Sequence, residues 1–408
     1  TMTLQEGIYW DSGQTPGRCA AFLFLRAPAG AAASAVGQTL RDVFVALRKL
    51  QGGAVPDLPG TALPKAFGFT ALVGYGVKAF RLAGAKRPAP APLVPFKSPL
   101  AGGGGPLLRG SGLRYASGVE RNPATEEVLL QFIGDTPLSV NLPVVETWKV
   151  LDDAAKATGE SPLAISAVFN GFNREDKRSW VDFHDGISNI PSGSDREKVI
   201  VCEVADTSAD AWLNGGTYLA FMRLRVDLGA WRRIPRHLQE ELVGRDKISG
   251  CALVGGSREA GWTKAVGCPF AGTVDITEPG NAAFQEPDGQ PQGAIIQSHV
   301  RRANHGRTNF QDPDSNRIYR QGYEFLDGVA PGSVPDAGLN FVSFQDTPKR
   351  LIDMLTMDTW LEKVNFGGDP ANPIPGSENL LSVLGAGLYA VPPAGAAGEA
   401  FPGESIFV

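Results

Sequence analysis

Histidine is scarce in this chain, so chemistry that needs an imidazole has few places to occur. Only four of the 408 residues are histidines. One of them, His299, follows an apolar run and precedes two arginines in GAIIQSHVRRAN (293–304). A neutral imidazole is a common ligand for metal ions, haem iron included. Taken alone, the segment also fits a partly buried structural histidine beside a basic surface. The other three are His184, His237 and His305.

Two aspartates flank one of these histidines. The segment DFHDGISN (182–189) places Asp182 and Asp185 three residues apart, with His184 between them. Gly186 follows Asp185 directly and can adopt a positive φ at little cost. Taken alone, an Asp-Gly step is typical of a turn that closes a strand.

Arginines are concentrated in two apolar segments. The segment RIYRQGYEF (317–325) is a basic strand or turn when read by itself. In 217–228, Arg223 and Arg225 occupy one face of a predicted strand, and every second residue from Tyr218 forms an apolar face opposite. Two arginines on a half-buried face require anionic partners, which are either carboxylates of a bound cofactor or protein carboxylates.

The composition is that of a globular protein, with 43% hydrophobic and 20% charged residues. The net charge of −5 provides no basic field for nucleic acid or an anionic membrane. No apolar run approaches the ~20 residues that span a bilayer. The first residues lack the basic and apolar regions of a secretory signal, so we expect a cytoplasmic protein. The four cysteines are widely spaced, and we expect free thiols.

Hydrophobic periodicity predicts the elements that must position these residues. In the first half we expect strands over 18–26, 66–74, 126–133 and 163–170, and helices over 32–50 and 142–156. A long loop rich in proline and glycine is expected within 83–115. In the second half we expect strands over 217–228, 339–345 and 380–391, and helices over 235–243 and 347–358.

The second half repeats the order of the first, with a long irregular stretch between its first helix and its next strand. Two β-α-β-β-α-β units indicate an α+β protein with a duplicated ferredoxin-like fold, in which helices pack on antiparallel sheets. We expect an N-terminal domain over 1–190, which includes the 83–115 loop, and a C-terminal domain over 191–408.

Taken in order, the segments resemble those of the dye-decolorizing peroxidase family of haem peroxidases. DFHDGISN resembles the family's GxxDG motif, SHVRRAN (298–304) its H-I-R-R-A-N segment, and RIYRQGYEF its R-I-L-R-R-G-Y-x-F segment. Asp182 stands where GxxDG has its first glycine. Further matches, which extend the resemblance over most of the chain, are LLQFIGD (129–135), GGTYLAFMRLRVDLGAW (215–231), GRDKISGCAL (244–253), LNFVSFQ (339–345) and LLSVLGAGLYAVPP (380–393).

The resemblance implies a role for each matching residue around an enclosed haem b. His299 would be the proximal iron ligand, Asp185 the distal acid–base residue and Arg320 the distal cation. A ligating histidine usually donates its other N–H to a carboxylate or a carbonyl. We expect the Glu378 carboxylate to accept this second N–H of His299. Further expected contacts to the pocket or the haem propionates are Asn189, Arg223, Arg225 and Phe341.

The resemblance also implies an activity. A haem-dependent peroxidase would reduce hydrogen peroxide and oxidise dyes, phenols, other aromatic compounds or Mn(II) through a ferryl intermediate. Because an aspartate works at lower pH than a histidine, an acidic optimum is expected. The carboxylates of Glu240 and Glu241 could bind Mn(II) or form a solvated helix face. Candidates for carrying electrons from bulky reductants are Trp180, Trp212, Trp231 and Tyr323.

A different class of function stays open beside the enzyme. The chain could be a haem-binding or iron-handling protein whose peroxidase activity is incidental. The sequence also leaves open whether the protein forms a homo-oligomer.

Overall fold

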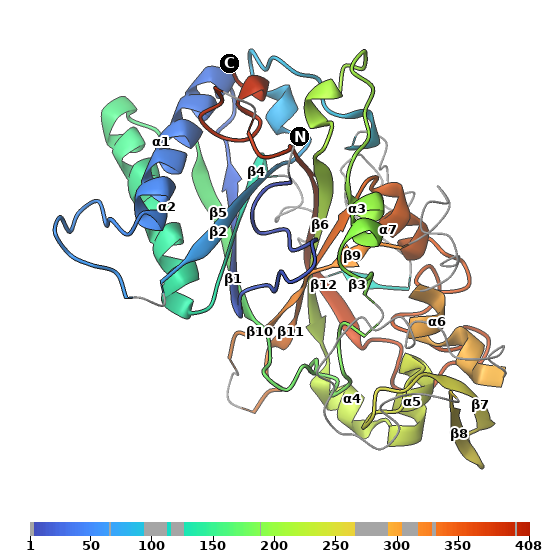
Figure 1. The fold of residues 1–408 in the computed structure, drawn as a ribbon. Helices are drawn as coiled ribbons and strands as arrows, with labels where there is room; N and C mark the ends of the chain where they lie inside the picture. Colours follow the sequence, from blue (N-terminus) through green and yellow to red (C-terminus); the bar gives the residue numbers. More distant parts are fainter. Residues whose placement is uncertain are drawn as a thin grey trace.

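The computed structural model describes most of the chain. The described residues are 4–64, 67–93, 112–115, 126–187, 189–265, 293–303, 317–328, 332–395 and 398–408. His305 and most of the predicted 83–115 loop lie outside them. Figure 1 shows helices on both sides of a central sheet region.

The first half of the chain builds a four-stranded antiparallel sheet. Its order is β5-β1-β4-β2, so the fourth strand of the unit lies at one edge of the sheet and the second strand at the other. This 4-1-3-2 order is that of a ferredoxin-like unit. The strands are β1 (Cys19–Arg26), β2 (Phe69–Tyr75), β4 (Val128–Gly134) and β5 (Ala164–Phe172).

The second half repeats this order with β12-β6-β11-β10. The second strand of this unit, β10, begins within the segment RIYRQGYEF and ends at Leu326. The strands are β6 (Thr217–Val226), β10 (Tyr323–Leu326), β11 (Ala337–Gln345) and β12 (Leu381–Val391). The duplicated ferredoxin-like fold expected from the sequence is therefore confirmed. The domain boundary near residue 190 stays a prediction.

The two sheets meet at both edges and close a ring of strands. One residue pair joins β12 to β2, and Glu324 of β10 pairs with Phe172 of β5 at the other junction. Aromatic side chains from both sheets fill the interior. Phe221 of β6, for example, lies with its ring centroid 5.2 Å from Phe22 and 5.0 Å from Phe24 of β1. The inner faces of both sheets thus form one shared core.

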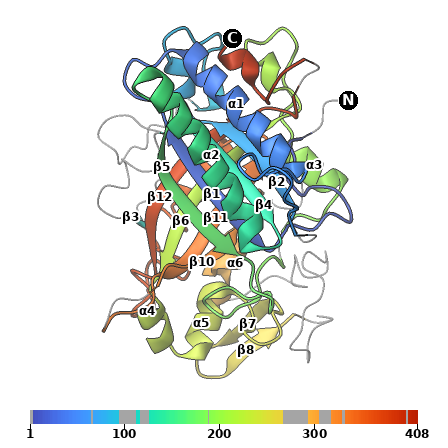
Figure 2. The same ribbon diagram turned by 90° about the vertical axis from the view of Figure 1, so that its left-hand side faces the viewer.

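Two long helices, α1 (Ala33–Gln51) and α2 (Pro137–Thr158), cover the outer face of the first sheet (Figure 2). The predicted start of the second helix at residue 142 is wrong. Thr136 caps α2 by accepting the Ser139 N–H, and Pro137 occupies the first turn, where it is tolerated. Pro143, which the prediction placed in the first turn, lies inside the helix.

The outer face of the second sheet carries short helices and irregular segments. The predicted helix over 347–358 is shorter, and the strand predicted from residue 66 begins at Phe69. The helices of this half are α3 (Ser194–Ile200), α4 (Leu228–Arg233), α5 (Arg236–Val243), α6 (His299–Ala303) and α7 (Lys349–Leu355). The remaining strands are β3 (Arg114–Tyr115), β7 (Leu253–Ser257), β8 (Gly261–Lys264) and β9 (Tyr319–Arg320).

The cysteines differ in state. Cys19 and Cys202 are free thiols, as expected, but Cys251 is disulfide-bonded, so the expectation of free thiols throughout is wrong. Across the described part of the chain, no helix has the length and apolar character that crossing a membrane requires.

Candidate functional site

A cavity of about 260 Å³ lies against the outer face of the second sheet. Met222 and Leu224 of β6 and Leu339 and Phe341 of β11 contribute apolar walls. The apolar face predicted for 217–228 therefore faces this cavity. Three residues singled out in the sequence also line it, namely His299, Asp185 and Arg320.

His299, the first residue of α6, is held on the cavity wall by aromatic contacts and one hydrogen bond. Its ring stacks on Phe366 with centroids 4.5 Å apart and meets the edge of Trp360 at 5.2 Å. Nδ1 donates to the Phe366 carbonyl oxygen at 3.1 Å, which leaves Nε2 with an electron pair to share. Burial lowers the pKa of His299 to about 4, so the imidazole is neutral near neutral pH.

The expectation that Glu378 accepts the His299 N–H is wrong. The Glu378 carboxylate is exposed and accepts the backbone N–H of Gly376 at 2.9 Å. The acceptor at His299 is instead a main-chain carbonyl, the second type of partner that orients such histidines.

Asp185 and Arg320 form an ion pair at the cavity. Nη1 of Arg320 lies 3.4 Å from Oδ1 of Asp185, with side chains 34% and 49% exposed. The Asp185 carboxylate also accepts the N–H of Gly186, whose φ is +80°. The charges of both residues reach His299, since the Arg320 cation lowers its pKa and the Asp185 carboxylate raises it. The three groups therefore share one electrostatic environment.

Asn189 does not line the cavity but holds Arg320 in place. Its Nδ2 donates to the Arg320 carbonyl oxygen at 2.7 Å, and its Oδ1 accepts the Arg320 N–H at 3.1 Å. The segment DFHDGISN (182–189), called the distal loop from here on, is thereby joined to strand β9 at Arg320. Asn189 thus fixes the main chain of Arg320.

Asp182 occupies the left-handed backbone region, with a φ of +65°. This conformation explains why a glycine suits the position, although Asp tolerates it better than most residues. Two cations lie near the carboxylate, Lys247 at 3.6 Å and Arg174 at 3.9 Å.

The expectation that Arg223 and Arg225 contact the pocket is not met. Arg223 points to the opposite face of β6 from the cavity, because successive strand side chains alternate. It binds Asp327 and Asn340 and lies 3.6 Å from the ring centroid of Phe325. Its anionic partner is thus a protein carboxylate. Arg225 is exposed on that same face.

Four residues at the cavity were not assigned to the pocket wall from the sequence, although each lies in or beside a quoted segment. Arg245 and Arg317 are buried cations, each 3% exposed. Glu324 is a buried carboxyl group on β10, and Trp180 precedes the distal loop. Arg245, Arg317 and Glu324 lie within quoted segments. Their burial could not be predicted, because a buried charged side chain has no characteristic pattern in the sequence.

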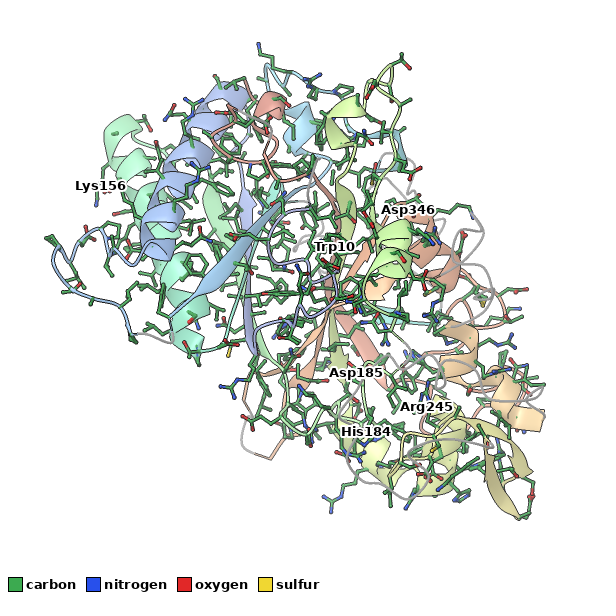
Figure 3. All side chains as sticks on the ribbon, in the orientation of Figure 1. Trp10, Lys156, His184, Asp185, Arg245 and Asp346 are labelled. Carbon is green, nitrogen blue, oxygen red and sulfur yellow. The ribbon has the colours of Figure 1, made fainter. Side chains whose placement is uncertain are left out.

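His184, a residue of the distal loop, also lines the cavity and contacts Arg178. Its Nε2 lies 2.8 Å from a guanidinium nitrogen of Arg178, which donates to the carbonyls of Asp182, Lys247 and Ile248 as well. In Figure 3, His184, Asp185 and Arg245 lie in the same lower part of the molecule, far from Lys156 at the outer side of α2.

Comparison with known proteins agrees with this architecture. Several solved structures are similar to nearly the whole chain, among them two from Streptomyces. A DyP-type peroxidase from Streptomyces coelicolor has a TM-score of 0.69 over 100% of this chain and 96% of its own. Ferric DtpA from Streptomyces lividans has a TM-score of 0.67 over 98% and 96%. At 22% identity, both likenesses establish the fold.

Curated relatives match over shorter stretches. A dye-decolorizing peroxidase of Thermobifida fusca is 30% identical over 157 residues, which are 37% of this chain and 30% of that protein. A deferrochelatase of Escherichia coli O157:H7 is 26% identical over 257 residues, 60% of this chain and 51% of that protein. The alignments thus span a third to a half of these relatives.

The sequence profile described as "Dyp-type peroxidase, C-terminal" matches residues 176–394, which is more than half of the 408 residues. The matched part contains the distal loop, His299, Arg320 and the whole second sheet. The chain belongs to the Dyp-type peroxidase family.

Proposed function

We propose that the protein is a haem-dependent peroxidase that reduces hydrogen peroxide and oxidises aromatic compounds. One observation carries the proposal. A single cavity is lined by a neutral imidazole, that of His299, and by the Asp185–Arg320 ion pair. An imidazole can hold iron, and a carboxylate beside a guanidinium can move a proton while charge develops nearby.

The residues around the cavity fit a haem group. His299 has Nδ1 engaged by the Phe366 carbonyl, so Nε2 would ligate the iron. The apolar side chains of Met222 and Phe341 suit the macrocycle, and the buried cations Arg245 and Arg317 suit its two carboxylates. When bound, the haem would supply the redox chemistry that reduces peroxide, with the electrons replaced by the reducing substrate.

Asp185 would accept a proton from the peroxide and donate it again. Cleavage of the O–O bond requires that one oxygen lose a proton and the other gain one. The Asp185 carboxylate would accept the first proton and return it to the departing oxygen. Arg320, at 3.4 Å, would stabilise the carboxylate and the negative charge that develops on the departing oxygen.

The position of Trp180 supports the proposal that aromatic compounds are the reductants. It is the candidate electron carrier that both lines the cavity and remains half-buried. Arg174 lies 5.1 Å from its ring centroid, and its indole N–H donates to the Phe325 carbonyl. Trp231 and Tyr323 are 4% and 0% exposed, so neither reaches a bulky dye.

Mn(II) is the less favoured reductant. Glu240 and Glu241 were the candidate ligands, but Glu240 accepts the Arg236 guanidinium at 2.8 Å and Glu241 binds Arg258 through both oxygens. Their exposed fractions are 9% and 1%, so the alternative of a solvated helix face is wrong as well. Both carboxylates serve internal ion pairs.

Iron handling is the second candidate function, because deferrochelatases are among the curated relatives. Incubation of the purified protein with haem separates the two candidates. Peroxidase function predicts an absorption spectrum typical of a histidine-ligated haem and turnover of an anthraquinone dye with hydrogen peroxide at acidic pH. Release of iron-free porphyrin without dye turnover would favour iron handling. Failure to bind haem would overturn both.

The proposed compartment differs from the cytoplasm expected above. Cys251 is disulfide-bonded, and such bonds are rare in cytosolic proteins. We therefore propose an oxidising compartment. Thiol titration of the denatured, unreduced protein should give two thiols per chain, whereas four would support the cytoplasm.

A further inference from the structure

The Phe366 carbonyl oxygen, which accepts the Nδ1–H of His299, accepts a second hydrogen bond. The indole Nε1 of Trp360 donates to the same oxygen at 2.8 Å, a shorter distance than the 3.1 Å from His299 Nδ1. A carbonyl oxygen has two lone pairs, so both donors can bind at once. The edge-on contact between the two rings, with centroids 5.2 Å apart, brings both N–H groups to this oxygen.

The Trp360 indole is held firmly in this position. The residue lines the cavity and is 2% exposed. Its backbone N–H donates to the Met357 carbonyl at 2.9 Å, and its own carbonyl accepts the N–H groups of Lys363 and Val364 at 2.8 and 2.9 Å. The main chain on both sides of Trp360 is therefore fixed by short-range hydrogen bonds.

The shared oxygen is fixed as well. The N–H of Gly368 donates to the Gln297 carbonyl at 2.9 Å, which ties this segment to the turn before His299. A Cβ atom on Gly367 would lie 2.8 Å from the backbone nitrogen of His299, so only glycine fits there. The peptide group between Phe366 and Gly367 thus packs directly on His299.

Sharing the oxygen weakens its bond to His299. Each donor draws electron density from the oxygen, so a carbonyl that serves two N–H groups holds each of them less strongly than it would hold one. The hydrogen bond at one imidazole nitrogen raises the basicity of the other nitrogen toward a metal. A weaker bond at Nδ1 therefore leaves Nε2 a weaker electron donor.

We propose that Trp360 is a positioning residue that limits the electron donation of His299 to the haem iron, because its indole N–H shares the Phe366 carbonyl. The inference rests on haem ligation by His299, which is part of the proposed function. Hydrogen bonding around the axial ligand is one of the means by which a protein sets the reduction potential of a haem. The Trp360 N–H would raise the potential of the ferric/ferrous couple.

The variant Trp360→Phe tests the inference in the haem-loaded protein, because phenylalanine keeps an aromatic ring and lacks the N–H. We expect the ferric/ferrous equilibrium to shift about tenfold toward the ferric form, which lowers the midpoint potential by about 59 mV for one electron. Resonance Raman spectroscopy of the ferrous protein should show a higher iron–histidine stretching frequency.

Benzothienylalanine placed at position 360 separates the N–H from the packing. It has the shape of tryptophan, with a sulfur in place of the indole N–H, and should reproduce both shifts. If Trp360→Phe shifts the potential but the isostere does not, lost packing or entry of water is the cause and the inference is wrong. Wild-type potentials and frequencies in both proteins would overturn it too.

Trp231→Phe is the matched control. Trp231 is 4% exposed and also lies against Phe366, with ring centroids 6.2 Å apart. Its indole N–H donates to the Val181 carbonyl at 3.2 Å and not to the shared oxygen. This variant should keep the wild-type midpoint potential and iron–histidine frequency.

Nuclear magnetic resonance of the haem-free protein tests the shared carbonyl without the cofactor. Removal of the indole N–H should move the Nδ1 proton resonance of His299 downfield, because its hydrogen bond to the Phe366 carbonyl strengthens. An unmoved resonance would overturn the inference, whatever the activity. If this resonance and the potential shift as expected but hydrogen peroxide is not reduced, the proposed function fails while the role of Trp360 stands.

Discussion

The side-chain amide of Asn189 holds the main chain of Arg320 by both of its polar groups. It donates to the carbonyl oxygen and accepts the N–H, at 2.7 and 3.1 Å, across 131 residues of sequence. The guanidinium that faces Asp185 therefore depends on a residue outside the cavity wall. In the same loop, the backbone N–H of Gly186 donates to the Asp185 carboxylate at 2.7 Å.

Removal of this amide should disturb catalysis more than stability. We expect Asn189→Ala to lower the free energy of unfolding by about 1–2 kcal/mol, the range for two lost hydrogen bonds. The rate of the peroxide reaction should fall about 10- to 100-fold, because small displacements of a reacting group are costly. Stopped-flow absorption of the haem-loaded protein measures this rate. Asn372→Ala, at an exposed turn, should leave both quantities unchanged.

Asp185→Asn should remove the proton acceptor while preserving the shape of the loop. We expect the peroxide reaction to slow by about 10²–10⁴-fold, the range for general acid–base catalysis. Haem binding and its absorption spectrum should be retained, because His299 is untouched. Asp195→Asn, an exposed carboxylate on α3, is the control. A wild-type peroxide rate in Asp185→Asn would refute the acid–base role.

The strained position 182 yields a prediction about stability alone. Asp182→Ala should lower the free energy of unfolding by about 1–2 kcal/mol, since alanine disfavours a φ of +65° and lacks the contacts to Lys247 and Arg174. Asp182→Gly relieves the strain, so it should stay within about 1 kcal/mol of the wild type. Urea unfolding compares the three proteins. Equal loss in both variants would show that the ion contacts, and not the backbone, dominate.

Residue patterns predicted the sheets because alternation and helical spacing are local properties of the chain. The alternating run over 217–228 became β6, and its apolar face lies at the cavity. The same alternation explains the failure at Arg223. The need of arginines for anions left a cofactor and a protein carboxylate open, and the family resemblance pointed to the pocket, but closure of the two sheets buries Arg223 against Phe169 and Asp327. Ring closure is a long-range property.

The candidate site shows a second limit. Asp185, Arg320 and His299 lie in motifs, so the sequence could point to them. The partner of His299 is the main-chain carbonyl of Phe366, and a main-chain atom has no signature in residue types. The choice of Glu378 assumed a side-chain acceptor. Glu324 lay inside a quoted segment, but only its burial beside Asp185 reveals its unusual proton affinity.

Glu324 should make stability depend on pH in a defined direction. Its pKa is raised to about 9 in the folded protein, against an ordinary value of 4.5. Between these values the folded state holds a proton that the unfolded state has released. Stability therefore falls as pH rises from about 4.5 to about 9, with a slope of at most about 1.4 kcal/mol per pH unit for one proton.

The difference between Glu324→Gln and the wild type isolates this contribution from all other titrating groups. Urea unfolding at pH 5 and pH 8 should show the variant gaining stability relative to the wild type at the higher pH. Glu127→Gln should shift in the same direction, because burial raises the pKa of that carboxyl too. The thermodynamic effect is thus shared by both buried acids. A wild-type-to-variant difference that is the same at both pH values would mean that Glu324 is ionised in the folded protein.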